Sequence, residues 1–174
     1  MEFRNESINL DLLPAMEEVE WVPLEKNYRK IMYINTLFLW VLPIGWLVLS
    51  VIMNWWQYPV WTGLAMGITL LIPVLSTILV NPSFLVKSYA IRTHDILFQT
   101  GLISRSQTIM PFDRVQHCEI NRGVLSRWLG LSELNIFTAG GSASDLSIPG
   151  LSEARAAELC QFILLKIDAT DEEE

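Results

Sequence analysis

Several side chains could in principle take part in catalysis. Asp113 and His117 lie four residues apart, and Ser104 and Ser106 precede them, so the residue types of a hydrolase triad are present. The segment around them alternates like a β-strand, in which residues four apart are separated by about 13 Å. The GxSxG sequence of many serine hydrolases does not occur in the chain. The pattern therefore predicts a protein that is not an enzyme.

Metal and phosphate sites are also weakly supported. His94, His117, Cys118 and Cys160 are residue types that bind metals, but no CxxC or comparable ligand spacing joins them. We interpret the two cysteines as reduced, mostly buried thiols. The stretch GGSAS at 140–144 is followed by neither a lysine nor a helix, so it predicts an ordinary loop rather than a phosphate cradle. We expect no metal and no cofactor.

The elements that position these residues begin with an uncharged stretch. Between Lys30 and Lys87 the chain has no Lys, Arg, Asp, Glu or His, and only 18% of the chain is charged, against about 25% in ordinary soluble domains. Within this stretch, residues 31–53 and 58–80 form two apolar runs. A helix of that length reaches roughly 34 Å, enough to cross a hydrocarbon core of about 30 Å. The sequence predicts a transmembrane hairpin.

The turn of this hairpin is rich in aromatic side chains, which favour the headgroup level of a bilayer. These interfacial aromatic residues are Trp55, Trp56, Tyr58 and Trp61. Pro59 suits the first turn of the second helix, because the missing N–H is not needed there.

Glycines and prolines within the spans predict how the helices pack and bend. Gly63 and Gly67 form a GxxxG pattern, which either lets a neighbouring helix pack closely, the first span through Gly45 being the obvious neighbour, or is a chance spacing. Pro43 and Pro73 each remove a backbone hydrogen bond, so both are expected to bend their helices.

Basic residues flank the two spans and predict their orientation. Lys26, Arg29 and Lys30 precede the first span, and Lys87 and Arg92 follow the second, while the turn has none. This distribution predicts a multi-pass protein of the bacterial cytoplasmic (inner) membrane with both termini in the cytoplasm. Lys26, Arg29, Lys30 and Lys87 are expected close to the anionic headgroups of the lipid bilayer.

Charge divides the chain into four segments. We expect a cytoplasmic acidic N-terminal arm at 1–27, the hairpin at 28–82, a cytoplasmic domain at 83–167 and an acidic tail at 168–174. In the arm, residues 16–21 form either a short surface helix or an extended segment packed on the later domain. The domain carries eight basic and seven acidic residues, a net charge of +1. This balance argues against nucleic-acid binding, which needs a clustered basic face.

The predicted cytoplasmic domain consists of short strands followed by a helix. The alternating or bounded runs are 84–92, 96–101, 104–110, 115–120, 134–139 and 146–150, with a short helical piece at 122–130 capped by Asn121. A terminal amphipathic helix is predicted over 152–167. Its apolar stripe consists of Ala156, Leu159, Cys160, Ile163 and Ile167, widened by Phe162 and Leu164. These elements predict an α+β fold, an antiparallel β-sandwich or half-barrel capped by a C-terminal helix.

Four short segments occur in a characteristic order: QTGLISR at 99–105, MPFDRVQ at 110–116, VLSRWLG at 124–130 and IFTAG at 136–140. Together with the hairpin upstream, this order resembles the bacterial pleckstrin-homology-like (PH-like) domain of YdbS-like membrane proteins. The resemblance covers about 28–167. It implies a PH-like fold on a membrane anchor with no known chemistry, and a hetero-oligomer with a larger, YdbT-like homologue that repeats the domain.

Four arginines are the remaining candidates for binding. Arg105, Arg114, Arg122 and Arg127 either form a face for a partner or for lipid headgroups, or are scattered, solvated side chains. Trp128, next to Arg127, lies either in the core, which is the favoured interpretation, or on the surface as an exposed anchor.

The sequence thus predicts a non-enzymatic, membrane-anchored PH-like interaction module that assembles with a larger membrane protein carrying repeated PH-like domains. One alternative is a component of envelope stress or resistance that recognises lipid headgroups, and another is an accessory subunit of a transporter. Because the domain has little net charge, we expect it to bind anionic vesicles weakly when excised.

Overall fold

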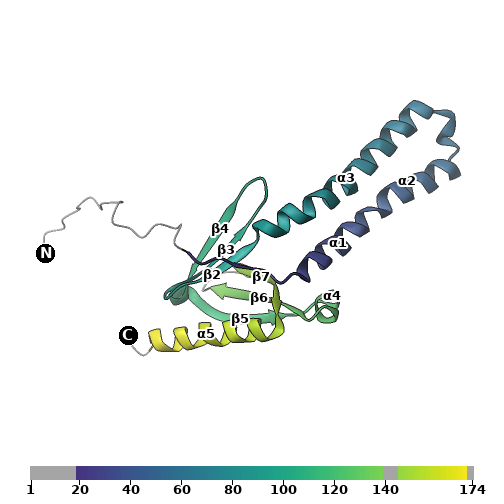
Figure 1. The fold of residues 1–174 in the computed structure, drawn as a ribbon. Helices are drawn as coiled ribbons and strands as arrows, with labels where there is room; N and C mark the ends of the chain where they lie inside the picture. The colour runs from purple at the N-terminus through teal and green to yellow at the C-terminus, as the bar shows by residue number, and fades with distance from the viewer. Residues whose placement is uncertain (1–18, 139–144, 172–174) are drawn as a thin grey trace, which may run out of the picture.

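The computed structural model describes residues 19–138 and 145–171, and it consists of a helical hairpin joined to a small β-rich domain (Figure 1). Two apolar stretches, Tyr28–Ile52 and Pro59–Val86, are long enough to cross a membrane. The hairpin is built from α1 (Tyr28–Leu39), α2 (Val41–Ile52), the short 3-10 helix η3 (Trp55–Gln57) and α3 (Pro59–Val86). The predicted pair of spans is therefore present as helices.

The first span is interrupted at Trp40, where α1 ends and α2 begins. Pro43 lies three residues later, and its ring displaces the carbonyl four residues back, that of Leu39. The Trp40 amide instead donates to the Leu37 carbonyl at 3.0 Å, a tighter turn than an α-helix makes. The first span is thus interrupted close to Pro43, whereas α3 continues through Pro73 and Pro82 as one helix. The predicted bends at Pro43 and Pro73 stay predictions.

The domain contains two antiparallel sheets that form a half-barrel. The first has the order β1-β2-β3-β4, with β1 (Val22–Pro23), β2 (Ser88–Ile91), β3 (Asp95–Thr100) and β4 (Ser106–Pro111). The second has the order β5-β6-β7, with β5 (Val115–Asn121), β6 (Leu131–Thr138) and β7 (Leu146–Ser152). The 3-10 helix η4 (Phe112–Arg114) joins the sheets, and α4 (Val124–Trp128) joins β5 to β6.

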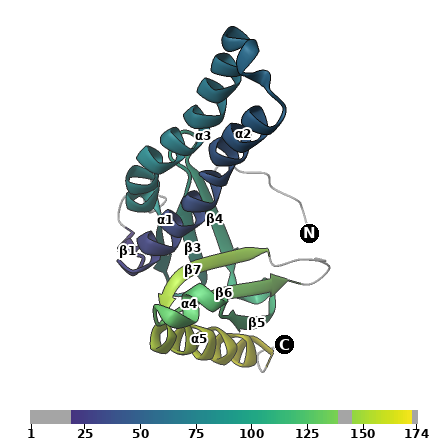
Figure 2. The same ribbon diagram turned by 90° about the vertical axis from the view of Figure 1, so that its right-hand side faces the viewer.

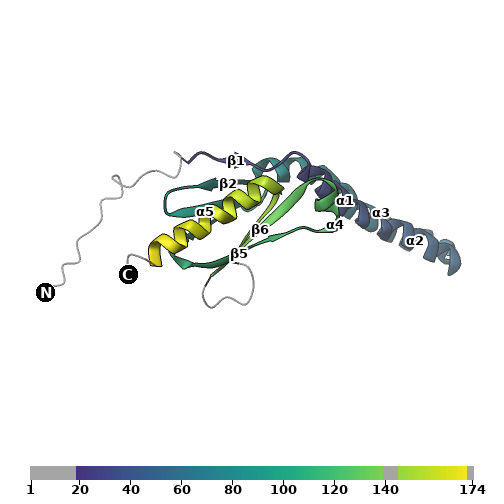
Figure 3. The same cartoon turned by 90° about the horizontal axis from the view of Figure 1, so that it is seen from below.

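The last element, α5 (Glu153–Asp171), closes the half-barrel, and Figure 3 shows it lying along the barrel between β2 and β5. Ala156, Leu159 and Ile163 are almost fully buried, as the stripe predicted. Leu164 is 43% exposed, so its predicted place in the stripe is wrong. It follows Ile163 by about 100° around the helix, which turns it away from the sheets. The predicted α+β PH-like fold, with its helical cap, is confirmed.

Three element boundaries differ from the prediction. α3 extends to Val86, so the predicted strand at 84–92 shortens to β2, and only Lys87 separates the helix from the sheet. Asn121 ends β5 rather than capping a helix, and Gly123 precedes α4. The arm contributes β1, which pairs with β2, while residues 19–21 form no helix. The first 18 residues of the predicted arm lie outside the part of the chain that the structure describes.

Chain direction determines which end of the domain faces the hairpin. β2 leaves α3 and runs away from it, β3 returns, β4 runs away again, and β5 returns to α4. The β3–β4 loop, α4 and the β7–α5 junction therefore lie at the end nearest the hairpin, while η4 lies at the opposite end. Figures 1 and 2 show this arrangement, with α4 beside the start of α1. We call this end the hairpin-facing end.

Candidate functional site

The structure does not assemble the residues of the imagined hydrolase triad. Ser104 and Ser106 lie at the hairpin-facing end of β4, whereas Asp113 lies in η4 beyond its other end. The His117 ring stacks on Phe137, with 4.5 Å between ring centroids and 7° between planes. These positions leave serine and histidine without a shared site.

The two cysteines are joined in a disulfide between β5 and α5, so the prediction of two reduced thiols is wrong. Cys118 and Cys160 are separated by 42 residues, yet the packing of α5 on β5 brings their Cα atoms to 6.0 Å. The sequence spacing could not reveal this, because the distance depends on where the helix docks. Among the described residues, no group of three or more His, Cys, Asp or Glu side chains could hold a metal ion. The loop at 140–144 lies outside the described part.

The junction between hairpin and domain is a packed interface. Phe84, in the last turn of α3, is 9% exposed and belongs to the core of the domain, as does Leu24 at the base of α1. Tyr28 and Met32 of α1 pack against the same core. The hairpin therefore enters the domain through side chains of both spans, and the domain is held in one orientation relative to it.

A close approach at Gly150 fixes the base of α1 against β7. Gly150 has a positive φ of 70°, and a Cβ added there would lie 2.5 Å from the Tyr28 ring. The Glu25 amide donates to the Gly150 carbonyl at 3.0 Å, directly before α1 begins. The ammonium of Lys87, at the end of α3, lies 5.3 Å from the centre of the same Tyr28 ring. Lys87 is half-buried, and this burial lowers the pKa of its ammonium.

The four basic residues near the spans lie where the hairpin joins the domain. Lys26, Arg29 and Lys30 are exposed around the first turn of α1, and Lys87 caps the end of α3. All four thus lie at the level where the hairpin meets the domain. Their contact with lipid headgroups stays a prediction.

The four candidate arginines do not form one face. Arg105 in the β3–β4 loop, Arg122 after β5 and Arg127 in α4 lie at the hairpin-facing end, whereas Arg114 in η4 lies at the opposite end. Arg122 makes an ion pair of 2.5 Å with Glu153 at the start of α5. Only three of these arginines can therefore act together.

Trp128 is 82% exposed, so its predicted place in the core is wrong. It lies at the C-terminal end of α4, which has only five residues and no buried side chain. In α4, Leu125 and Ser126 are half-buried, whereas Val124, Arg127 and Trp128 face outward. The sequence signal that remained was the pairing of Trp128 with basic Arg127, which suits an exposed interfacial residue.

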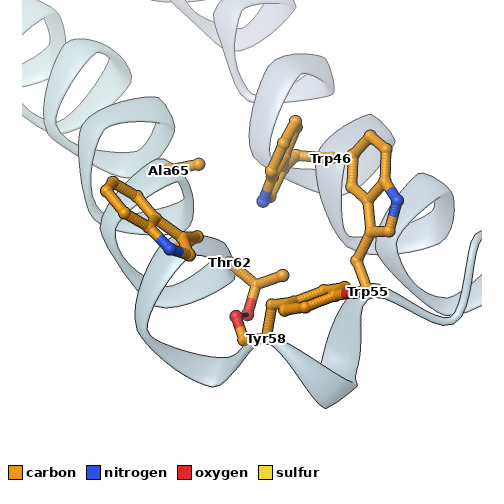
Figure 4. A pocket seen from close by; sticks show the side chains of 6 residues that line it. Trp46, Trp55, Tyr58, Thr62 and Ala65 are labelled. Carbon is orange, nitrogen blue, oxygen red and sulfur yellow. Dashed lines mark hydrogen bonds between the residues drawn. The ribbon is translucent and has the colours of Figure 1, made fainter.

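The aromatic turn at the other end of the hairpin encloses a pocket of about 250 Å³ (Figure 4). Trp46 and Trp55 lie with their ring centroids 5.4 Å apart, and the indole N–H of Trp46 is buried without a hydrogen-bond partner. Trp56, in contrast, donates to the Asn54 side chain at 2.6 Å and is exposed. The pocket is lined by Trp46, Trp55, Tyr58, Trp61, Thr62 and Ala65. Trp46 was missed because it lies within the apolar run rather than in the turn.

The glycines of the GxxxG pattern do not pack against the first span. A Cβ added at Gly63, Gly67 or Gly45 would meet no atom within 4 Å. Gly63 and Gly67 are exposed on α3. A packing role for these two glycines thus stays a prediction and would involve a helix outside this hairpin.

A second pocket lies between the arm and α5, and Arg155 is the one arginine among the residues that line it. It has a volume of about 320 Å³ and is lined by Val22, Pro23, Glu25, Tyr89, Leu151, Ser152 and Arg155. Arg155 donates to the Tyr89 hydroxyl at 3.2 Å and to the Glu158 carboxylate at 2.7 Å. The guanidinium is thus used in holding α5 to β2.

Comparison with known proteins agrees with this architecture. The family model described as "Bacterial PH domain" matches residues 29–166, which include both spans and nearly all of the β-rich domain. The chain is 27% identical over 129 residues to the UPF0699 transmembrane protein YdbS of Bacillus subtilis (strain 168), covering 73% of this chain and 79% of that protein. No solved structure matches the chain. The chain belongs to the bacterial PH domain family, and it is a YdbS-like membrane protein.

Proposed function

We propose that this chain is a non-enzymatic interaction module of the bacterial cytoplasmic membrane, which assembles with a larger, YdbT-like membrane protein carrying repeated PH-like domains. The basic residues beside the domain and their absence from the turn at 54–57 support an orientation with both termini in the cytoplasm. The hairpin anchors the module, and the PH-like domain supplies the contacts.

The observation that carries this proposal is the open edge of each sheet. Among the described residues, β4 pairs only with β3, and β5 pairs only with β6. Each of these strands therefore presents one row of unpaired backbone groups, which can accept a strand from another chain. Ser106, Gln107 and Ile109 of β4 are exposed, and Ile109 supplies an apolar contact there.

Because the hairpin anchors the chain in the membrane, a weak contact at the edge of β4 is sufficient for assembly with a partner in the same membrane. Because α1 and α3 pack into the domain core, β4 is held in a fixed position relative to the hairpin. Confinement to one membrane raises the effective concentration of any partner in that membrane. Within the bilayer, the exposed stripe at Gly63 and Gly67 offers a surface on which a helix of the same partner can pack closely.

Site-specific photocrosslinking in the source bacterium tests this proposal. A benzoylphenylalanine introduced at Gln107 in the edge strand is expected to capture one membrane protein whose own sequence contains PH-like domains. The matched control places the same crosslinker at Leu165, an exposed position on the outer side of α5. Capture of lipid alone at Gln107, or the same products at both positions, would contradict the proposal.

A further inference from the structure

The most exposed large apolar side chains at or beyond the base of the hairpin gather at one end of the molecule. In the part of the chain that the structure describes, Ile103 is 93% exposed, Trp128 82%, Leu85 79% and Val124 74%. The next most exposed, Leu165, lies on α5. Side chains of this size are rarely left in water in such a cluster unless they contact another apolar phase.

These four residues come from three different segments of the chain. Leu85 is in the last turn of α3, Ile103 is at the tip of the β3–β4 loop, and Val124 and Trp128 are in α4. All three segments lie at the hairpin-facing end, because β3 and β5 both run toward the base of the spans. Figures 1 and 2 show the β3–β4 loop beside α3 and α4 beside α1. The fold thus places separate apolar tips around the two helices.

Basic side chains accompany the apolar tips. Arg105 follows Ile103 in the loop, and Arg127 precedes Trp128 in α4; both are exposed. Arg29 and Lys30 are exposed at the start of α1, at the same end. Three acidic groups lie at the same end: Glu153 is paired with Arg122, Glu133 accepts a hydrogen bond from the Ser147 hydroxyl, and Glu25 is exposed. Apolar tips with exposed cations beside them match the layering of a bilayer surface, in which anionic headgroups lie outside the acyl chains.

We propose that the hairpin-facing end of the domain is seated in the lipid leaflet, with Ile103, Val124 and Trp128 inserted at the level of the headgroups and upper acyl chains. The occupant is lipid rather than protein because Leu85 lies on the same exposed face of α3 as Ile78 and Leu71, seven and fourteen residues earlier, and this is the face that the span presents to the bilayer. Tryptophan at this depth is in the environment it prefers. This contact is apolar and anchored, so it does not require the headgroup-binding pocket that a free domain would need, and it is independent of the proposed edge contact at β4.

Depth measurement in a bilayer that contains only this protein tests the seating. Full-length Ile103→Cys and Trp128→Cys variants are labelled with an environment-sensitive fluorophore and placed in nanodiscs of zwitterionic and anionic phospholipid. Some of the lipids carry a nitroxide quencher near the top of the acyl chain. The disulfide leaves Cys118 and Cys160 unlabelled, and the unsubstituted protein supplies the blank. Leu85→Cys is the positive control, and Leu165→Cys is the matched water-exposed control.

Labels at 103 and 128 are expected to emit at shorter wavelength and to be quenched several-fold more strongly than the label at 165, approaching the label at 85. Adding Trp128→Asp to the variant labelled at 103 is expected to reduce that quenching, because a carboxylate would resist insertion. Since Trp128 is exposed, this substitution leaves the fold intact. Labels at 103 and 128 that behave like the one at 165 would overturn the proposal. So would labels that leave water only after a protein partner is added.

Discussion

At the scale of single residues, the contact between Gly150 and Tyr28 decides how the hairpin joins the domain. Only a residue without a Cβ permits the positive φ together with this close approach. The Glu25 amide, three residues before α1 begins, donates to the carbonyl of the same glycine.

Gly150→Ala is expected to destabilise the protein by about 2–4 kcal/mol, combining left-handed strain with a clash against Tyr28. Gly130→Ala is the matched control, because Gly130 has a similar φ of 67° but open space where its Cβ would be. The control is expected to lose only about 1–2 kcal/mol. Denaturant unfolding in detergent measures both. Equal losses of stability in the two variants would show that the close approach to Tyr28 contributes nothing to the stability of the protein.

The disulfide makes a second prediction at this scale. Closing a loop of 42 residues restricts the unfolded chain, so the oxidised protein is expected to be more stable than the reduced protein by about 2–4 kcal/mol. Cys160→Ser should remove this difference. Cytosolic reductants keep most thiols reduced, so a domain in the cytoplasm would gain this stability only under oxidising conditions. Identical melting of the protein with and without a reductant would contradict the prediction.

At the scale of elements, α5 shows what periodicity can and cannot predict. The stripe of Ala156, Leu159 and Ile163 was predictable, because a helix against a sheet buries residues three and four apart. The end of α3 was not, because Phe84 and Leu85 fit a strand and a helix equally well. The position of Trp128 beside the hairpin was also hidden, since it depends on which end of the domain faces the hairpin, a consequence of strand order.

Ile163→Asp is expected to destabilise the domain by several kcal/mol, since Ile163 is 1% exposed and the substitution would put a carboxylate into the core. Leu165→Asp, on the exposed side of the same helix, is expected to change stability by less than about 0.5 kcal/mol. Thermal unfolding followed by circular dichroism compares the two. A normal melting profile for Ile163→Asp would mean that α5 does not close the half-barrel.

At the scale of the whole molecule, the hairpin and the domain form one body. Both spans contribute side chains to the domain core, and the α3 helix passes into β2 through a single residue, Lys87. The family and the presence of a hairpin were predictable from the order of motifs and from the uncharged stretch. The rigid junction was not, because the residues at 81–83 resemble a linker in composition.

The central claim is that the hairpin crosses the membrane and holds the PH-like domain on the cytoplasmic side. Cysteine labelling in intact cells with a membrane-impermeant thiol reagent tests it most directly, using Asn54→Cys in the turn and Leu165→Cys on α5. The unsubstituted protein controls for Cys118 and Cys160. We predict that the cysteine at 54 reacts from outside and that the cysteine at 165 reacts only after the membrane is permeabilised. Labelling at 165 in intact cells, or protection at 54, would contradict the account.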